Sequence, residues 1–85
     1  MKIHDNNDLY ATVRELCRIL ESLGSTVYSE NLRGALSISS LPGEVLGEIG
    51  LSMKAIRGDA VYSELEVRTR VDEAIAYVNK ALGLK

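Results

Sequence analysis

The chain has 85 residues, 46% of them hydrophobic and 26% charged, with a formal net charge of −2. A chain of this length forms one domain. Its hydrophobic content is too high for intrinsic disorder, and its net negative charge is not typical of a nucleic-acid-binding domain. No apolar run approaches the ~18 residues of a membrane span, and residues 1–5 lack the apolar stretch of a signal peptide. The single cysteine cannot form an intramolecular disulfide. We therefore expect a soluble, cytoplasmic protein.

The first predicted helix runs from about Asp8 to Leu23, between capping candidates at residues 5–7 and Gly24. Residues 1–7 are expected to be mobile. The apolar side chains of this helix cover nearly half of its surface, which is wider than the ~100° stripe that one neighbour requires. They are Leu9, Tyr10, Val13, Leu16, Cys17, Ile19, Leu20 and Leu23. We expect this helix to contact either two neighbouring helices or one helix and a second chain.

Residues 26–38 predict a shorter second helix, whose apolar stripe is weakened by Gly34 and by the serine-rich residues 37–40. The third predicted helix starts near Pro42, because proline suits a first helical turn, and ends at Gly58. Beside its apolar stripe lies a row of three glycines: Gly43, Gly47 and Gly50. An interior glycine costs about 1 kcal/mol relative to alanine. The row indicates either a face for close helix packing or a segment that is partly non-helical.

The fourth predicted helix begins with Ser63 as its N-cap, because residues 63–66 (Ser-Glu-Leu-Glu) fit a capping box. Apolar residues from Val67 to Leu82 then share one face, and Gly83 ends the helix. Strand patterns are nearly absent. The sequence therefore predicts an all-α fold, a compact bundle of about four short helices in a single domain over residues 1–85, and we expect this bundle to dimerise.

Few residues suggest catalytic or metal-binding chemistry. The single histidine, His4, has no preorganised partners in the N-terminal stretch. Cys17 lies on the apolar side of its helix, which is typical of a small buried side chain and not of a nucleophile. Glu44 and Glu48 share a helix face, but the Glu-x-x-His spacing of a di-metal site does not occur. We predict a protein that is not an enzyme and has no cofactor or metal.

Residues 45–56 resemble the centre of a helix-turn-helix. In that family a turn glycine lies between hydrophobic residues, a serine follows, and an apolar residue anchors the second helix. The residues at those places are Ile49, Gly50, Leu51, Ser52 and Ile56. Leu46 departs from the pattern, since a small residue is expected four positions before the turn glycine. The resemblance implies DNA binding, although only Lys54 and Arg57 could contact a phosphate backbone from the second helix.

The sequence favours a protein-binding module whose first partner is a second copy of the chain. A small domain gains by burying apolar surface through association, and twofold homodimers are the commonest oligomers. The candidate interface residues are Leu9, Leu16, Ile19, Leu23, Gly43, Gly47 and Gly50. Two alternatives stay open. One is an immunity- or antitoxin-type inhibitor whose acidic surface masks a basic partner, and the other is a helix-turn-helix DNA-binding protein.

Overall fold

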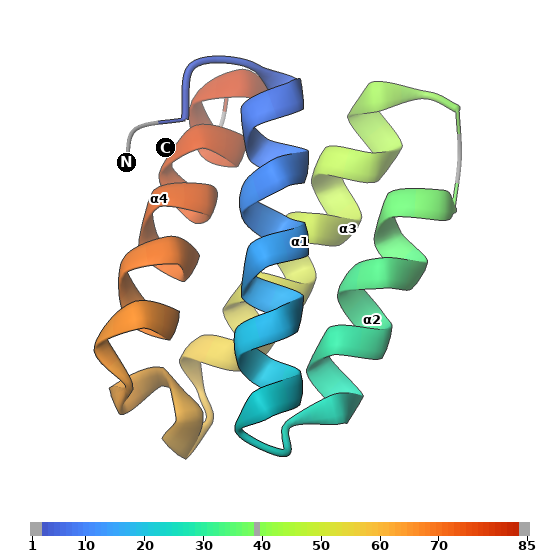
Figure 1. The fold of residues 1–85 in the computed structure, drawn as a ribbon. Helices are drawn as coiled ribbons and strands as arrows, with labels where there is room; N and C mark the ends of the chain where they lie inside the picture. The colour runs from blue at the N-terminus through green and yellow to red at the C-terminus, as the bar shows by residue number, and fades with distance from the viewer. Residues whose placement is uncertain (1–2, 39, 84–85) are drawn as a thin grey trace.

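Four helices, running alternately up and down, form the bundle in the computed structural model, which describes residues 3–38 and 40–83 (Figure 1). They are α1 (Asn6–Ser22), α2 (Thr26–Ser37), α3 (Pro42–Arg57) and α4 (Leu65–Ala81), and a short 3-10 helix, η1 (Ala60–Ser63), precedes α4. α1 and α3 each pack against both α2 and α4. The described residues contain no strand, and the predicted all-α class is confirmed.

The wide apolar side of α1 is covered within the chain. α1 lies between α2 and α4 and contributes these buried residues: Leu9, Thr12, Val13, Leu16, Cys17 and Leu20. Thr12 interrupts the apolar half in the sequence, yet it is buried with the rest. Of the two predicted arrangements, contact with two neighbouring helices is confirmed.

The start of α1 is capped and attached to α4. The Asp5 carboxylate accepts a hydrogen bond from the Asp8 backbone N–H at 2.8 Å, and the Tyr77 hydroxyl donates to the Asn6 side-chain oxygen. Ile3 packs against the core. We predicted mobility for residues 1–7. Residues 1 and 2 lie outside the described part of the chain, whereas residues 6 and 7 form the start of α1.

α2 is one continuous helix, although it contains Gly34. Its apolar stripe consists of Tyr28, Leu32, Ala35 and Leu36, of which Leu32 and Ala35 are buried. The sequence did not indicate that Ser29 would be fully buried as well. The Ser29 hydroxyl donates a hydrogen bond to the Thr26 carbonyl oxygen at 2.9 Å, one turn earlier, so the buried polar group is satisfied.

α3 is also a single helix, with no turn at Gly50. A Cβ at Gly50 would lie 3.2 Å from the Val78 Cγ1 atom of α4, so this glycine lets the two helices approach closely. The helix-turn-helix interpretation of residues 45–56 is therefore wrong, because the segment does not change direction. The interpretation of the glycine row as a partly non-helical segment is wrong for the same reason. At Gly50 the other interpretation, a face for close helix packing, is confirmed.

The start of α4 differs from the predicted capping box. Ser63 belongs to η1, and its hydroxyl donates to the Ala60 carbonyl oxygen at 2.8 Å. The N-cap of α4 is Glu64, whose side chain makes no capping hydrogen bond. The cap in this region is instead Asp59, whose carboxylate accepts from the Val61 backbone N–H at 3.0 Å at the start of η1.

Ser63→Ala should change the free energy of unfolding by less than about 0.5 kcal/mol, as is usual for a surface substitution that removes no cap. Urea denaturation would measure this change. Asp59→Ala is the comparison, because it removes a carboxylate that does cap a helix, and it should lower stability more. A loss of ~1 kcal/mol for Ser63→Ala would instead indicate that Ser63 caps α4 in solution.

Candidate functional site

The chemistry-bearing side chains of the described residues are dispersed. No group of three or more His, Cys, Asp or Glu within residues 3–38 and 40–83 could hold a metal ion. None of the helices in that part of the chain is long and apolar enough to cross a membrane. His4 lies exposed before α1, where its backbone N–H donates to the Asp8 carboxylate at 3.1 Å.

Cys17 lies in the core, where α1 packs against α2. Its thiol is buried and donates to the Ser29 carbonyl oxygen over 3.6 Å. Burial raises the pKa of the thiol, and the positive charge of Arg33 offsets only part of this increase. The predicted interpretation of Cys17 as a small buried side chain is confirmed.

The Cys17 thiol should react with a thiol-specific disulfide reagent at least ~10-fold more slowly in the native protein than in denaturant, because only a locally opened state exposes it. The rate is followed by absorbance at neutral pH, with free cysteine as the reference. Equal rates in the native and the denatured protein would contradict the burial.

Hydrogen bonds from tyrosine hydroxyls to carboxylates connect the helices at the end of the bundle where η1 lies. The Tyr28 hydroxyl donates to Asp59 at 2.8 Å, while Asp72 accepts from the Tyr62 hydroxyl at 2.6 Å and from Arg57 at 3.0 Å. The Val61 N–H and the Tyr28 hydroxyl together lower the pKa of the Asp59 carboxyl. Each group has a partner within the chain, so these contacts have a structural role.

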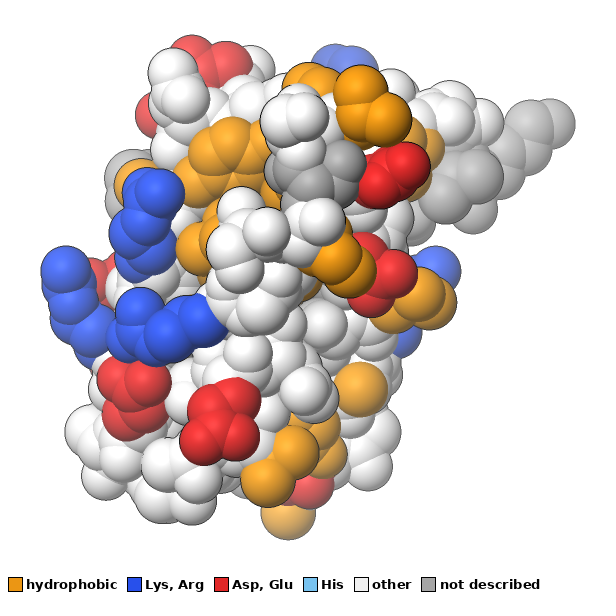
Figure 2. All heavy atoms as spheres, turned by 90° about the vertical axis from the view of Figure 1, so that its right-hand side faces the viewer, with side chains coloured by type: hydrophobic (Ala, Val, Ile, Leu, Met, Phe, Trp, Pro, Cys, Tyr) orange, Lys and Arg blue, Asp and Glu red, His pale blue; other side chains and the backbone are white. Residues whose placement is uncertain are grey.

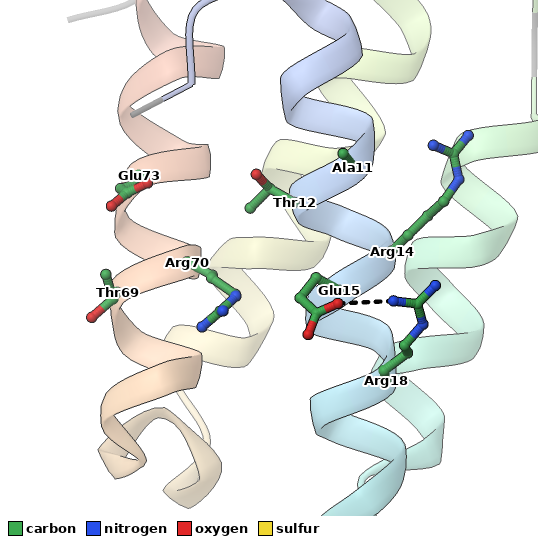
Figure 3. Close-up of a pocket in the computed structure, with 8 residues that line it drawn as sticks. All are labelled: Ala11, Thr12, Arg14, Glu15, Arg18, Thr69, Arg70 and Glu73. Atoms are coloured by element: carbon green, nitrogen blue, oxygen red, sulfur yellow. Dashed lines mark hydrogen bonds and ion pairs between the residues drawn. The ribbon is translucent and has the colours of Figure 1, made fainter. Parts of the chain in front are cut away.

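A polar groove of about 540 Å³ lies between α1 and α4 (Figure 3). Its lining includes three arginines and two glutamates: Arg14, Arg18, Arg70, Glu15 and Glu73. Arg18 forms an ion pair with Glu15 at 2.9 Å, and Figure 3 shows Arg14 and Arg18 directed away from α4, whereas Arg70 points from α4 toward α1. The charges are mixed and the arginines diverge, so the groove favours no particular ligand chemistry.

A second groove, of about 480 Å³ and lined by both hydrophobic and charged residues, lies on the other side of α4, between α3 and α4. We call it the α3–α4 groove, and its lining residues are Ile38, Glu44, Gly47, Glu48, Gly50, Leu51, Lys54, Val78, Asn79 and Leu82. Three of its hydrophobic side chains are exposed: Leu51 by 64%, Ile38 by 58% and Leu82 by 36%. Single exposed hydrophobic residues are common, but several around one hollow are typical of an interaction surface.

The helical repeat of α3 explains why an exposed leucine lies in this groove. The residues that α3 buries in the core are Val45, Leu46, Ile49, Gly50, Met53 and Ile56. At about 100° per residue, Gly47 and Leu51 lie on the opposite side of the helix. Figure 2 faces the side of the bundle on which α2 and α3 lie. It shows exposed hydrophobic side chains interspersed with acidic ones, and basic side chains gathered at the left of the view.

The predicted interface residues of α1 lie mostly in the core. Leu9 and Leu16 are fully buried within the chain, so they are not part of the surface of the bundle. Ile19 is half-buried against the core. Leu23, the C-cap residue of α1, is exposed. The structure therefore leaves little of the predicted α1 surface available to a partner.

The predicted glycine row divides into two parts. Gly50 packs against α4, whereas a Cβ at Gly43 or Gly47 would meet no described atom within 4 Å. Gly47 and Gly50 line the α3–α4 groove together with Leu51, which sequence reasoning did not select. The signal that could have identified Leu51 is a large apolar residue on the side of α3 opposite its core stripe.

No protein-family model matches the chain. No solved structure gives a significant match either. The surface of the bundle itself is therefore the basis for a functional interpretation.

Proposed function

We propose that the protein is a non-enzymatic protein-binding module that forms a homodimer. The exposed hydrophobic cluster of Ile38, Leu51 and Leu82 around the α3–α4 groove is the observation that supports this function. Covering such side chains with a partner removes apolar surface from water, which contributes about 25 cal/mol per Å². A small bundle has a limited core, so burial through association adds substantially to its stability.

The structural support for a dimer comes from α3 and not from α1. The sequence predicts a wide apolar side on α1, but α2 and α4 cover it. The α3–α4 groove keeps its hydrophobic side chains exposed in the isolated chain.

An immunity- or antitoxin-type inhibitor is the second candidate function. Glu44 and Glu48 line the same groove, and acidic groups beside an apolar cluster would suit a basic protein partner. Lys54 lies in the groove as well, so the surface carries both signs of charge. A mixed surface of this kind suits self-association better than capture of a strongly basic partner.

Light scattering after size exclusion, over a range of protein concentrations, tests the homodimer. The wild-type protein should show a mass that rises to that of two chains. Leu51→Glu should weaken this association, because it places a charge in the apolar cluster. Leu65→Glu is the matched control, since Leu65 is equally exposed, by 64%, but lies at the start of α4, outside the groove.

A wild-type protein that stays monomeric at every concentration would contradict the homodimer. Equal effects of Leu51→Glu and Leu65→Glu would indicate that the groove has no special role in association. Circular dichroism of both variants shows whether the fold is retained, so a change in mass can be assigned to the interface.

A further inference from the structure

Four residues form a stripe along the side of α3 that faces away from the core: the exposed Glu44, Leu51 and Lys54 and the half-buried Gly47. Their spacing of three, four and three residues keeps them on one face of a helix. All four line the α3–α4 groove, with Ile38 and Leu82 beside them. We call these four residues the α3 stripe.

The α3 stripe is complementary to the α3 stripe of a second copy that runs antiparallel to it. Glu44 and Lys54 lie at equal distances from the midpoint of the stripe, near Ile49, and so do Gly47 and Leu51. In an antiparallel pair of α3 helices, Glu44 would therefore face the partner's Lys54, and Leu51 would face the partner's Gly47. A twofold axis produces each contact twice.

Gly47 makes room for no neighbouring side chain in the part of the chain that the structure describes. A Cβ at this position would meet no described atom within 4 Å, in contrast to Gly50, which makes room for Val78. An interior glycine destabilises a helix relative to alanine, so a glycine here is unfavourable for the isolated chain. The partner's Leu51, seated over Gly47, would explain the glycine, because the missing side chain lets the second helix approach closely.

The two charges of the stripe have no partner in the described part of the chain. Neither Glu44 nor Lys54 forms an ion pair or a side-chain hydrogen bond there, whereas Arg33 and Glu21 pair at 3.1 Å. Glu44 and Lys54 also lie about 15 Å apart along α3, given a rise of ~1.5 Å per residue, so they cannot pair with each other. An antiparallel second copy would bring opposite charges together at both ends of the contact.

From these observations we infer that two copies of the protein associate through an antiparallel, twofold α3–α3 contact centred near Ile49. In this contact Leu51 packs over the partner's Gly47, Glu44 pairs with the partner's Lys54, and Ile38 and Leu82 flank the contact. The inference rests on the proposed homodimer and specifies its geometry.

Charge exchange tests the antiparallel pairing. Glu44→Lys and Lys54→Glu each turn both predicted ion pairs into like-charge pairs, so each variant alone should dimerise about tenfold more weakly than the wild type. An equimolar mixture of the two variants restores opposite charges at both ends and should form a heterodimer of nearly wild-type affinity. Sedimentation equilibrium measures the four dissociation constants, those of the wild type, the two variants and the mixed heterodimer.

Substitution of glycine tests the close approach. Gly47→Leu fills the position of the partner's Leu51 and should raise the dissociation constant more than tenfold, while the monomer stays folded. Gly34→Leu is the matched control, because Gly34 is also an interior helix glycine with no described atom within 4 Å of an added Cβ. It lies in α2, outside the α3 stripe, and should leave dimerisation unchanged.

The outcomes distinguish this geometry from the proposed function. A wild-type dimer that Glu44→Lys, Lys54→Glu and Gly47→Leu all leave unchanged would overturn the α3–α3 contact and leave the homodimer in place. Two weakened variants whose mixture does not recover would overturn the antiparallel orientation. A wild type that is monomeric at every concentration would overturn the homodimer itself, and the α3–α3 contact with it.

Discussion

Leu20→Asp should unfold the bundle. Leu20 has no exposed surface and lies on the side of α1 that α2 and α4 cover. Removing a buried leucine side chain costs about 2–5 kcal/mol, and a buried carboxylate without a partner adds a further penalty. The total stability of a domain of this size is only about 4–13 kcal/mol, so the variant should show no cooperative thermal transition by circular dichroism.

Leu23→Asp is the matched control on the same helix. Leu23 lies about one turn beyond Leu20 and is 46% exposed. The variant should remain folded and lose about 1 kcal/mol or less, mainly because an acidic residue is unfavourable near a helix C-terminus. A normal melting curve for Leu20→Asp would contradict the assignment of this side of α1 to the core.

Gly50→Leu and Gly47→Leu should change the stability of the monomer in opposite directions, although the positions are three residues apart. At Gly50 even a Cβ would lie 3.2 Å from the Val78 Cγ1 atom, so a leucine must push α3 and α4 apart. Overpacking of this kind costs about 1–3 kcal/mol. At Gly47 a side chain enters open space, and the higher helix propensity of leucine should add about 0.5–1 kcal/mol.

Urea denaturation at low protein concentration measures both variants, because dilution keeps association from contributing to the unfolding free energy. Gly50→Ala provides a milder test of the same contact. If Gly50→Leu and Gly47→Leu had the same effect, α3 and α4 would not approach each other at Gly50 as the structure shows.

The helices themselves could be predicted from the sequence because each of them buries a stripe with the helical repeat. The exact start of α4 could not, because two capping signals lie close together. Ser63 has the sequence of a capping box, yet α4 begins without a side-chain cap. Asp59 caps η1 instead, and the hydrogen bond from Tyr28 of α2 to Asp59 is a tertiary contact. Local sequence does not reveal which of two such signals a distant side chain will stabilise.

The α3–α4 groove was harder to predict because its hydrophobic side chains come from separate parts of the chain. Ile38 follows α2, Leu51 belongs to α3, and Leu82 follows α4. Their proximity depends on the order of the helices in space. The same dependence explains why Gly50 was interpreted as the turn glycine of a helix-turn-helix. A glycine that allows two helices to approach cannot be distinguished by its sequence neighbours from a glycine in a turn.

The order of the helices also has a consequence for how the chain folds. The contacts of α2 with α1 and α3, and of α3 with α4, join segments that are neighbours in the sequence, so these pairs can form after closure of short loops. Only the α1–α4 contact, with its Asn6–Tyr77 hydrogen bond, joins the two ends of the bundle. We therefore expect folding within microseconds to milliseconds, as in other helical bundles of low contact order. If α1 and α4 meet last, substitutions between them should accelerate unfolding more than they slow folding.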